Sequence, residues 1–235
     1  MTIADRVRSL AWSEIEASLW EFGYARISEL LTADECAGLI ALYNDDLHFR
    51  SRIDMARYRF GVGDYKYFDY PLPAVVQQLR LNTYPPLAGI ANRWMEATGS
   101  DERFAPSLEE FHERCRALGQ TKPTPLLLHY EAGGYNCLHQ DLYGELAFPL
   151  QLVCFLSRPN ADYAGGEFLL LEQRPRAQSV GEAVLPNQGE AIVFTTRYRP
   201  VKGSRGYYRV NMKHGVSRVK SGTRYTLGVI FHEAK

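Results

Sequence analysis

The sequence predicts an α+β fold in which a helix-rich first half packs on a second half of antiparallel strands. Three observations predict it. Apolar residues recur at helical spacing in several segments before residue 122. From Pro123-Thr124-Pro125 onward, short β-rich runs alternate with turns that contain Gly, Pro and Asn. Short strands spaced in this way are typical of a sandwich or jelly roll.

The first half is predicted to contain mostly helices. Residues 5–20 have helical spacing, and residues 23–27 form a short strand. Thr32 and Glu35 fit a capping box, because hydroxyl and carboxylate can each bond a free amide of a helix that runs to about Tyr43. Further helices are predicted over about 74–80, 86–98 and 107–118. Between these helices, residues 48–70 are dense in Arg and Tyr, with a turn at Gly61 and Gly63.

The second half is predicted to be a series of strands. The predicted strands are 125–130, 137–141, 148–156, 167–171, 191–194, 208–219 and 223–232. Gly165 and Gly166 fit a hairpin turn that needs positive φ. No internal repeat or low-complexity linker interrupts the chain, so residues 1–235 are interpreted as a single domain with a helix-rich part (1–122) and a jelly-roll core (123–235).

Charge and cysteine content narrow the class of protein. Lys plus Arg and Asp plus Glu number 27 each, so no global charge attracts nucleic acid or anionic membrane. The N-terminus is charged, and no segment approaches the roughly 18 apolar residues of a membrane span. We therefore expect a soluble, cytoplasmic protein with no membrane partner. Four dispersed cysteines form no CxxC pair and are expected to be reduced, with Cys154 in the core.

Three residues have the pattern of an iron site. His139 and Asp141 are two positions apart at a predicted strand end, so their side chains share one face. His214 begins another strand and can supply the third ligand. Two imidazoles and one carboxylate on one face of an octahedron suit Fe(II) and leave three positions open.

Two other histidines are alternatives to His214. His129 adjoins Tyr130, and strand alternation sends neighbouring side chains to opposite faces, so His129 is expected in the core or behind the ligands. His232, close to the C-terminus, is expected at the surface.

A second polar pair follows the third ligand. Arg224 lies ten residues after His214, and Thr226 shares its face of a strand. A guanidinium there can bind a carboxylate in a bidentate pair, and the hydroxyl can add a hydrogen bond.

The order of these motifs resembles the 2-oxoglutarate/Fe(II)-dependent dioxygenase superfamily, with a prolyl-hydroxylase-like core. The resemblance covers about residues 124–232 and includes Gly165-Gly166-Glu167 and the segment Pro186 to Phe194. It implies a double-stranded β-helix core. It also implies that His139, Asp141 and His214 bind Fe(II) and that Arg224 and Thr226 bind the far carboxylate of 2-oxoglutarate, with O2 as the oxidant. Tyr130 resembles the tyrosine that contacts this cosubstrate in AlkB-like members.

Two basic, aromatic segments indicate a substrate surface. Residues 195–220 contain eight Lys or Arg, no acidic residue and interleaved tyrosines, and residues 48–70 repeat the mixture. Cations meet phosphates and aromatic rings stack on bases in nucleic-acid contacts. The alternative is that both segments are solvated faces. The residues predicted to contact substrate are Arg57, Tyr65, Tyr67, Arg197 and Arg205.

Residues 53–73 resemble a bacterial oxygenase family predicted to act in oxidative repair of alkylated nucleic acid. This resemblance implies a dioxygenase that hydroxylates a C–H bond, with demethylation of DNA or RNA bases as the reaction in DNA repair. Two alternatives stay open. One is a hydroxylase of a protein side chain or small metabolite, and the other is a non-catalytic metal-binding sensor. A structural zinc site would normally have four protein ligands, which disfavours the second.

Overall fold

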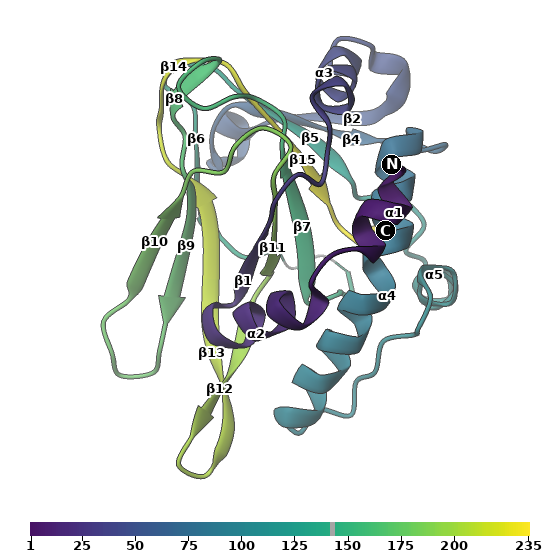
Figure 1. Ribbon diagram of the computed structural model, residues 1–235, viewed down its shortest axis with the longest axis vertical. Helices are drawn as coiled ribbons and strands as arrows, with labels where there is room; N and C mark the ends of the chain where they lie inside the picture. Colours follow the sequence, from purple (N-terminus) through teal and green to yellow (C-terminus); the bar gives the residue numbers. More distant parts are fainter. Residues whose placement is uncertain (142–143) are drawn as a thin grey trace.

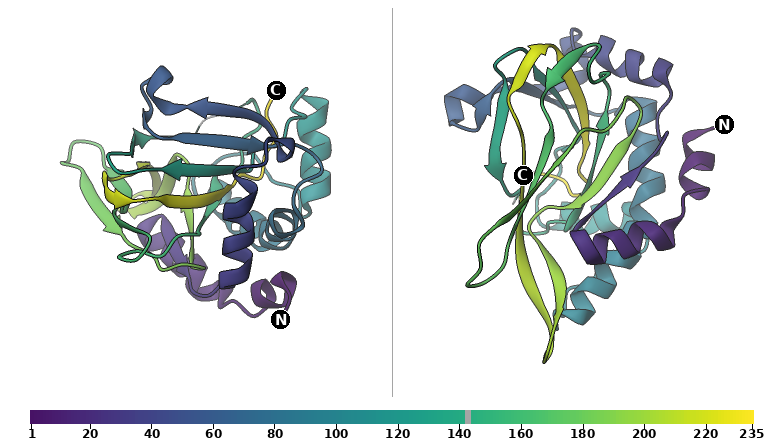
Figure 2. Two further views of the ribbon diagram at one scale, coloured as in Figure 1. Left: turned by 90° about the horizontal axis from the view of Figure 1, so that it is seen from above. Right: turned by 60° about the vertical axis from the view of Figure 1, so that its left-hand side comes forward.

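Two antiparallel sheets face each other in the computed structural model, which describes residues 1–141 and 144–235 (Figure 1). The larger sheet has the strand order β1-β11-β7-β15-β5-β4-β2, and the smaller has the order β10-β9-β13-β6-β3. Strand β12 pairs with β13, and β14 pairs with β8. Helices α4 and α5 lie on the side of the larger sheet that is away from β9 and β10 (Figure 2). The predicted combination of helices and antiparallel strands is confirmed.

The elements have the following bounds. The larger sheet contains β1 (Tyr24–Ile27), β2 (Phe49–Asp54), β4 (Asp64–Phe68), β5 (Leu126–Tyr130), β7 (Leu150–Phe155), β11 (Ala191–Thr195) and β15 (Arg224–Val229). The smaller sheet and its partners contain β3 (Gly61–Val62), β6 (Tyr135–His139), β9 (Phe168–Gln173), β10 (Val180–Val184), β12 (Tyr198–Gly203) and β13 (Gly206–Val216). The remaining strands are β8 (Tyr163–Gly165) and β14 (Val219–Gly222). The helices are α1 (Ile3–Arg8), α2 (Trp12–Phe22), α3 (Ala33–Leu42), α4 (Ala74–Ala97) and α5 (Leu108–Ala117), with short 3-10 turns η1 (Asp46–His48) and η2 (Met55–Tyr58).

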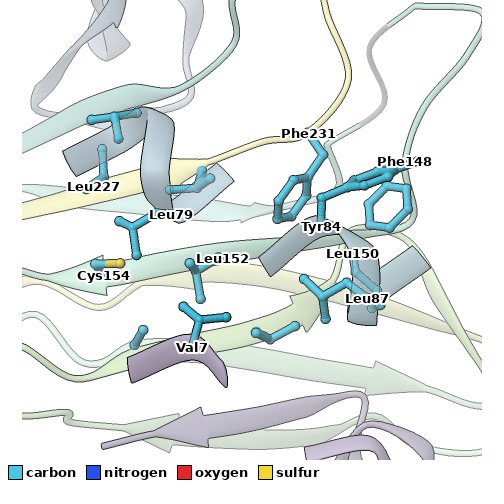
Figure 3. Close-up of a cluster of buried hydrophobic side chains, with 14 of the residues drawn as sticks. Val7, Leu79, Tyr84, Leu87, Phe148, Leu150, Leu152, Cys154, Leu227 and Phe231 are labelled. Atoms are coloured by element: carbon cyan, nitrogen blue, oxygen red, sulfur yellow. The ribbon is translucent and has the colours of Figure 1, made fainter. Parts of the chain in front are cut away.

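The main hydrophobic core lies between the larger sheet and the helices. Leu79 and Leu87 of α4 and Val7 of α1 meet Leu150 and Leu152 of β7 in this core (Figure 3). All five side chains are buried. Burial of a Leu or Val side chain stabilises a fold by about 1.5–3 kcal/mol. This core fixes the larger sheet as the rigid base on which the site is built.

A smaller core fills the space between the two sheets. It contains Val153 and Phe155 of β7, Phe194 of β11, and Phe168 and Leu170 of β9. Because alternate residues of β7 point to opposite faces, one strand contributes to both cores. The inner face of the larger sheet is therefore partly apolar, and the polar site described below interrupts it.

The helix predictions were partly right. The capping box of α3 is present, since the Thr32 hydroxyl accepts a hydrogen bond from Glu35 N (3.2 Å) and the Glu35 carboxylate accepts one from Thr32 N (2.8 Å). Residues 5–20 form two short helices, α1 and α2, instead of one. Conversely, the helices predicted over 74–80 and 86–98 are one helix, α4, although it contains Pro85 and Pro86.

Packing explains why α4 continues through its two prolines. Each proline removes a helical amide donor, which costs about 3 kcal/mol in a helix interior. Tyr84 and Leu87 on either side of the pair are completely buried, and Tyr84 stacks on Phe111 at 5.3 Å between ring centroids. The buried aromatic contacts offset the lost backbone hydrogen bonds.

Residues 48–70 form strands that the sequence did not reveal. β2 and β4 extend the larger sheet, and β4 pairs directly with β5. Lys66 is buried because its ammonium donates to Tyr43 O (2.8 Å) and Asp46 (2.6 Å). Gly63, at φ 142°, lies where a Cβ would come within 2.8 Å of the Tyr130 ring. This segment therefore forms a wall of the site.

Other predictions are settled by burial. All four cysteines are free, and Cys154 is buried as predicted. The prediction that His232 lies at the surface is wrong: it is 1% exposed, and its Nδ1 accepts a hydrogen bond from Phe148 N (3.2 Å). The segment is buried because Arg80 of α4 donates to the carbonyls of Ile230, Phe231 and His232. Among the described helices, none has the length and apolar character that a membrane span requires.

Candidate metal centre

His139, Asp141 and His214 come together between the two sheets. His139 ends β6, and His214 lies directly opposite it on β13, as a Cα partner in the strand register. Asp141 follows two residues after His139, so a single turn of chain brings the carboxylate to both imidazoles. His129 does not join them; its Nδ1 bonds Asp64 at 2.9 Å, a contact outside the group of three.

The spacing of the three side chains fits an octahedral metal ion. His139 Nε2 lies 3.3 Å from Asp141 Oδ1, and His214 Nε2 lies 3.2 Å from Asp141 Oδ2. Ligand atoms that bind at about 2.1 Å and at right angles to each other lie about 3 Å apart. The observed distances agree with this value, and two imidazoles with one carboxylate are a donor set for Fe(II).

Neighbouring groups orient the ligands. The Nδ1 of His139 is 2.8 Å from the carbonyl oxygen of Cys137, which leaves Nε2 to face Asp141. Gln151 of β7 donates from Nε2 to Asp141 Oδ2 at 2.7 Å. Outer contacts of this kind fix the tautomer and direction of metal ligands. Gln151 was not singled out in the sequence, because it stands inside the apolar run of β7.

The protonation states of Asp141 and His214 suit metal binding, whereas His139 must lose its proton when a metal binds. Burial raises the pKa of the Asp141 carboxyl, but His214 and His139 outweigh burial and hold that pKa well below its usual range. Burial lowers the pKa of His214. For His139, burial lowers the pKa, but the contact with Asp141 outweighs it and the pKa is raised. An ionised carboxylate and a neutral imidazole are the forms that bind metals.

A cavity of about 440 Å³ opens beside these ligands, and Arg224 lies in its wall. Arg224 is 1% exposed, and its Nε and Nη1 find no hydrogen-bond partner within residues 1–141 and 144–235. The rings of Tyr130 and Phe155 each lie 5.5 Å from the guanidinium carbon. Tyr163 also contacts the guanidinium, but two of the three guanidinium nitrogens stay without a hydrogen-bond partner among the described residues, and incomplete pairing of a buried charge costs free energy. The cavity therefore has a site for an anion next to the site for a metal.

The local fold places Arg224 and its neighbours. Arg224 is the Cα partner of Tyr130 across β15 and β5, and Thr226 lies two positions further on the same face. Gly166 has φ 63°, and a Cβ there would come within 2.9 Å of Arg224 Cδ. The predicted positive φ is confirmed, but the predicted hairpin is wrong, because β8 pairs with β14 and β9 pairs with β10 and β13; the glycine allows the close approach of the arginine. Tyr130 and Thr226 are both buried and both line the cavity.

The cavity also receives the predicted substrate residues Tyr65 and Tyr67. They project from β4, and their rings meet edge to face at 5.4 Å. Several further lining residues were not predicted as site residues, although Arg59 and Phe60 stand within the basic, aromatic segment 48–70. These are Arg59, Phe60, Asn136, Leu138, Gln140 and Gln151.

Three other predicted substrate residues do not line the cavity. Arg57 lies in η2 and borders a separate, shallow depression with Arg52 and Asp54. Arg197 is exposed, and its carbonyl accepts a hydrogen bond from Gln140 (2.7 Å). Arg205 lies at the tip of the β12–β13 hairpin, which extends away from the rest of the molecule (Figure 1).

The β12–β13 hairpin is therefore mostly remote from the metal ligands. Eight residue steps of β13 separate Gly206 from His214, which is about 27 Å of extended chain. Arg199 is buried and bonds Glu172 at 2.6 Å, so its charge is used inside the protein. The basic half of residues 195–220 thus lies away from the metal ligands, because β13 carries it outward into the hairpin.

A family model places the chain among known proteins. Residues 63–234 match the Oxygenase-NA family, described as an oxygenase that catalyses oxidative methylation of damaged DNA. The chain belongs to the Oxygenase-NA family. This oxygenase is also 50% identical, over 71% of its length, to uncharacterised proteins from two strains of Mycobacterium tuberculosis, and the match covers 72% of those proteins.

Solved structures show the same fold. A prolyl-4-hydroxylase from Pseudomonas putida has a TM-score of 0.58 at 17% identity, covering 96% of this chain and all of that one. An oxidoreductase of the 2OG-Fe(II) oxygenase family from Burkholderia pseudomallei has a TM-score of 0.53 at 15% identity, covering 96% of this chain and 93% of that one. The predicted jelly-roll core is confirmed, and His139, Asp141 and His214 fit the iron site that such an enzyme needs.

Proposed function

We propose that this oxygenase depends on Fe(II) and 2-oxoglutarate and removes methyl groups oxidatively from alkylated bases of DNA or RNA. The observation that carries the proposal is Arg224. A fully buried guanidinium with two unpaired nitrogens shares one cavity with two imidazoles and a carboxylate at octahedral spacing. A dicarboxylate can satisfy both features, since one end binds a metal and the other end pairs with an arginine.

The residues of the cavity have separate tasks in this proposal. His139, Asp141 and His214 hold Fe(II), and Gln151 keeps the Asp141 carboxylate in place. Arg224 binds the far carboxylate of 2-oxoglutarate, with Thr226 and Tyr130 as hydrogen-bonding neighbours. Apolar side chains complete the wall and exclude water, which strengthens these charge contacts. The apolar wall includes Leu128, Val153, Phe168, Phe194 and Ile230.

Fe(II), 2-oxoglutarate and O2, when bound, supply the oxidant that hydroxylates a C–H bond, while the cosubstrate becomes succinate and CO2. Hydroxylation of an N-methyl carbon gives a hemiaminal, which loses formaldehyde and leaves the N–H of the repaired base. A base inside a duplex must first leave the stack to enter such a cavity. Membership of the Oxygenase-NA family, whose members are described as acting on damaged DNA, supports damaged DNA as the substrate class.

Succinate formation tests the cosubstrate half of the proposal. We expect turnover to require both Fe(II) and 2-oxoglutarate and to be abolished in Asp141→Ala, because this change removes the shared carboxylate between the two histidines. Asp34→Ala, an exposed position in the first turn of α3, is the matched control and should keep full turnover. Metal binding without any turnover would favour a sensor module instead.

Formaldehyde release tests the substrate half. The unaltered protein, loaded with Fe(II), should release formaldehyde from single-stranded DNA or RNA that carries N-methylated bases, and mass spectrometry should show the loss of the methyl group. Succinate without formaldehyde reveals uncoupled turnover. Hydroxylation confined to peptides or small metabolites would replace nucleic-acid repair with the alternative class of substrate.

A further inference from the structure

Exposed aromatic and aliphatic side chains gather at the edge of the cavity. Tyr58 is 53% exposed, Phe60 is 47% exposed and Leu138 is 41% exposed. The rings of Tyr58 and Phe60 stack at 5.6 Å with an interplanar angle of 20°. Exposure of adjacent large apolar side chains has a solvation cost, and grouped exposure of this kind marks an interaction site.

The fold holds this group against the metal-bearing strand. β3 pairs with β6, and Cys137 N donates to Phe60 O at 2.8 Å. Arg59, Phe60 and Leu138 all line the cavity that contains His139. The η2 turn projects beyond the ends of β2 and β4 (Figure 2), and the side chains of Tyr58 and Phe60 are exposed there.

Positive charge accompanies the rings. Arg57 and Arg59 flank Tyr58, and both arginines are exposed. Arg59 has the left-handed conformation (φ 60°), which ends η2 and turns the chain toward the cavity. Residues 55–62 contain no acidic residue, and although Asp54 and Asp64 border the same depression as Arg57, no carboxylate except the metal ligand Asp141 lines the cavity beside Arg59.

We propose that these residues (Arg57, Tyr58, Arg59, Phe60 and Leu138), here called the aromatic rim, bind single-stranded nucleic acid beside the base that enters the cavity. This inference rests on the proposed function and names the surface that serves it. Neighbouring bases stack on Phe60 and Tyr58, and the adjoining phosphates pair with Arg57 and Arg59. Stacking of this kind tolerates any sequence, because every base has a π face.

The charge pattern favours a nucleic-acid strand over other partners. A purely apolar partner would leave two exposed cations unpaired, and an acidic peptide would leave the stacked rings without planar partners. A single strand offers alternating rings and negative charges at one face. The basic β12–β13 hairpin lacks this arrangement near the cavity, since Arg199 is already paired with Glu172.

Binding of a labelled, unmodified 12-nucleotide single-stranded DNA to the full chain tests the aromatic rim. In fluorescence anisotropy, Tyr58→Ala and Phe60→Ala should each weaken binding and raise the dissociation constant about five- to a hundredfold. Arg57→Ala should reduce the slope of log Kd against log salt concentration by about 0.7. Tyr208→Ala and Arg205→Ala, on the remote hairpin, should leave Kd within about twofold, and circular dichroism checks that every variant is folded.

Different outcomes overturn different statements. The proposal that the aromatic rim binds nucleic acid is overturned if the rim variants bind the oligonucleotide as tightly as the unaltered chain. It is also overturned if Tyr208→Ala or Arg205→Ala weakens binding as much as the rim variants do. The proposal is also overturned if a peptide displaces the labelled DNA at a lower concentration than an unlabelled oligonucleotide does. Formaldehyde release by the unaltered chain from a methylated oligonucleotide is measured separately, so a failed rim can be told apart from a failed repair function.

Discussion

The two faces of the larger sheet come from the same strands but differ in chemistry. On β15, Leu227 points into the apolar core against the helices, whereas Arg224 and Thr226 point into the cavity. On β7, Leu150 faces the helices and Gln151 faces the metal ligands. The outer face is held mainly by apolar packing, together with the hydrogen bonds that Arg80 donates to the carbonyls of Ile230, Phe231 and His232. The inner face has buried polar atoms of Gln151, His214 and Arg224 that lack hydrogen-bond partners among the described residues. A bound ligand that pairs with these atoms should therefore stabilise this face.

Arg224→Leu should show the largest effect on the inner face. Loss of a buried partner for a carboxylate costs about 2–5 kcal/mol, so the Kd for 2-oxoglutarate should rise by about thirtyfold or more. Stability without ligand should change little, because two nitrogens of the buried guanidinium lack hydrogen-bond partners among the described residues and leucine can still pack on the rings of Tyr130 and Phe155. Calorimetric titration and urea unfolding measure the two effects. Arg218→Leu, at an exposed position, is the control, and a marked loss of stability in Arg224→Leu would break the comparison.

Leu227→Ala, on the outer face of the same strand, should lower stability and leave the affinity for 2-oxoglutarate unchanged. Removing this completely buried side chain leaves a cavity in the core, and the free energy of unfolding should fall by about 2–5 kcal/mol. The affinity for 2-oxoglutarate, measured well below the unfolding transition, should stay close to that of the unaltered chain. A large loss of affinity with unchanged stability would show that the two faces are not independent.

Gln151→Leu sharpens the comparison within β7. The change keeps the volume of the side chain but removes the donor to Asp141, so metal affinity should fall about ten- to a hundredfold. Stability should hold or improve, because the Gln151 carbonyl oxygen has no partner in the described part of the chain. Anaerobic titration with Fe(II) or Co(II) measures the affinity. Gln188→Leu, whose amide donates to Leu156 O instead, should leave metal affinity unchanged.

The smallest effect concerns pH on the helix side of the sheet. Burial and Arg80 lower the pKa of His112 to about 3, so its contact with Glu233 at 3.2 Å is made by a neutral imidazole. Because the folded pKa lies below the unfolded value, the unfolded chain binds more protons as the pH falls from about 6.5 toward 3. Stability should then fall by at most about 1.4 kcal/mol per pH unit from this residue.

His112→Gln isolates that contribution, since glutamine can still donate to the carbonyl of Phe231 but does not titrate. Urea unfolding at pH 7.5, 6.0 and 5.0 should give a flatter pH dependence for the variant than for the unaltered chain. Parallel curves would show that His112 does not titrate differently in the folded and unfolded states.

Local sequence patterns predicted the parts of the fold and site that depend on neighbouring residues. The capping box from Thr32 to Glu35 is a four-residue pattern, and it forms as expected. His139 and Asp141 share a segment, and Arg224 and Thr226 share a strand face, so alternation alone pairs each set. The structure gathers these side chains in one cavity, and their roles as ligands and cosubstrate contacts stay proposals.

Long-range partners explain what the sequence could not reveal. The strand β4 buries Asp64 and Lys66, which look like surface residues until Tyr43 and Asp46 of another segment pair with them. Burial raises the pKa of Asp64, but hydrogen bonds from His129, Tyr43 and Arg52 outweigh burial and lower that pKa to about 2. The role of Gln151 could not be predicted from the sequence either, because it depends on a hydrogen bond to Asp141, which comes from a different segment of the chain.

Cys137 gives the molecule a built-in reporter. Its amide bonds the carbonyl of Phe60 in the aromatic rim, and its own carbonyl bonds the imidazole of His139. A single residue thus links the substrate surface to a metal ligand through two hydrogen bonds of 2.8 Å. If nucleic acid stacks on Phe60 as proposed, it contacts the residue whose carbonyl holds the peptide that sets the direction of His139. Spectra of the bound metal should therefore register the arrival of nucleic acid before any bond of the substrate is broken.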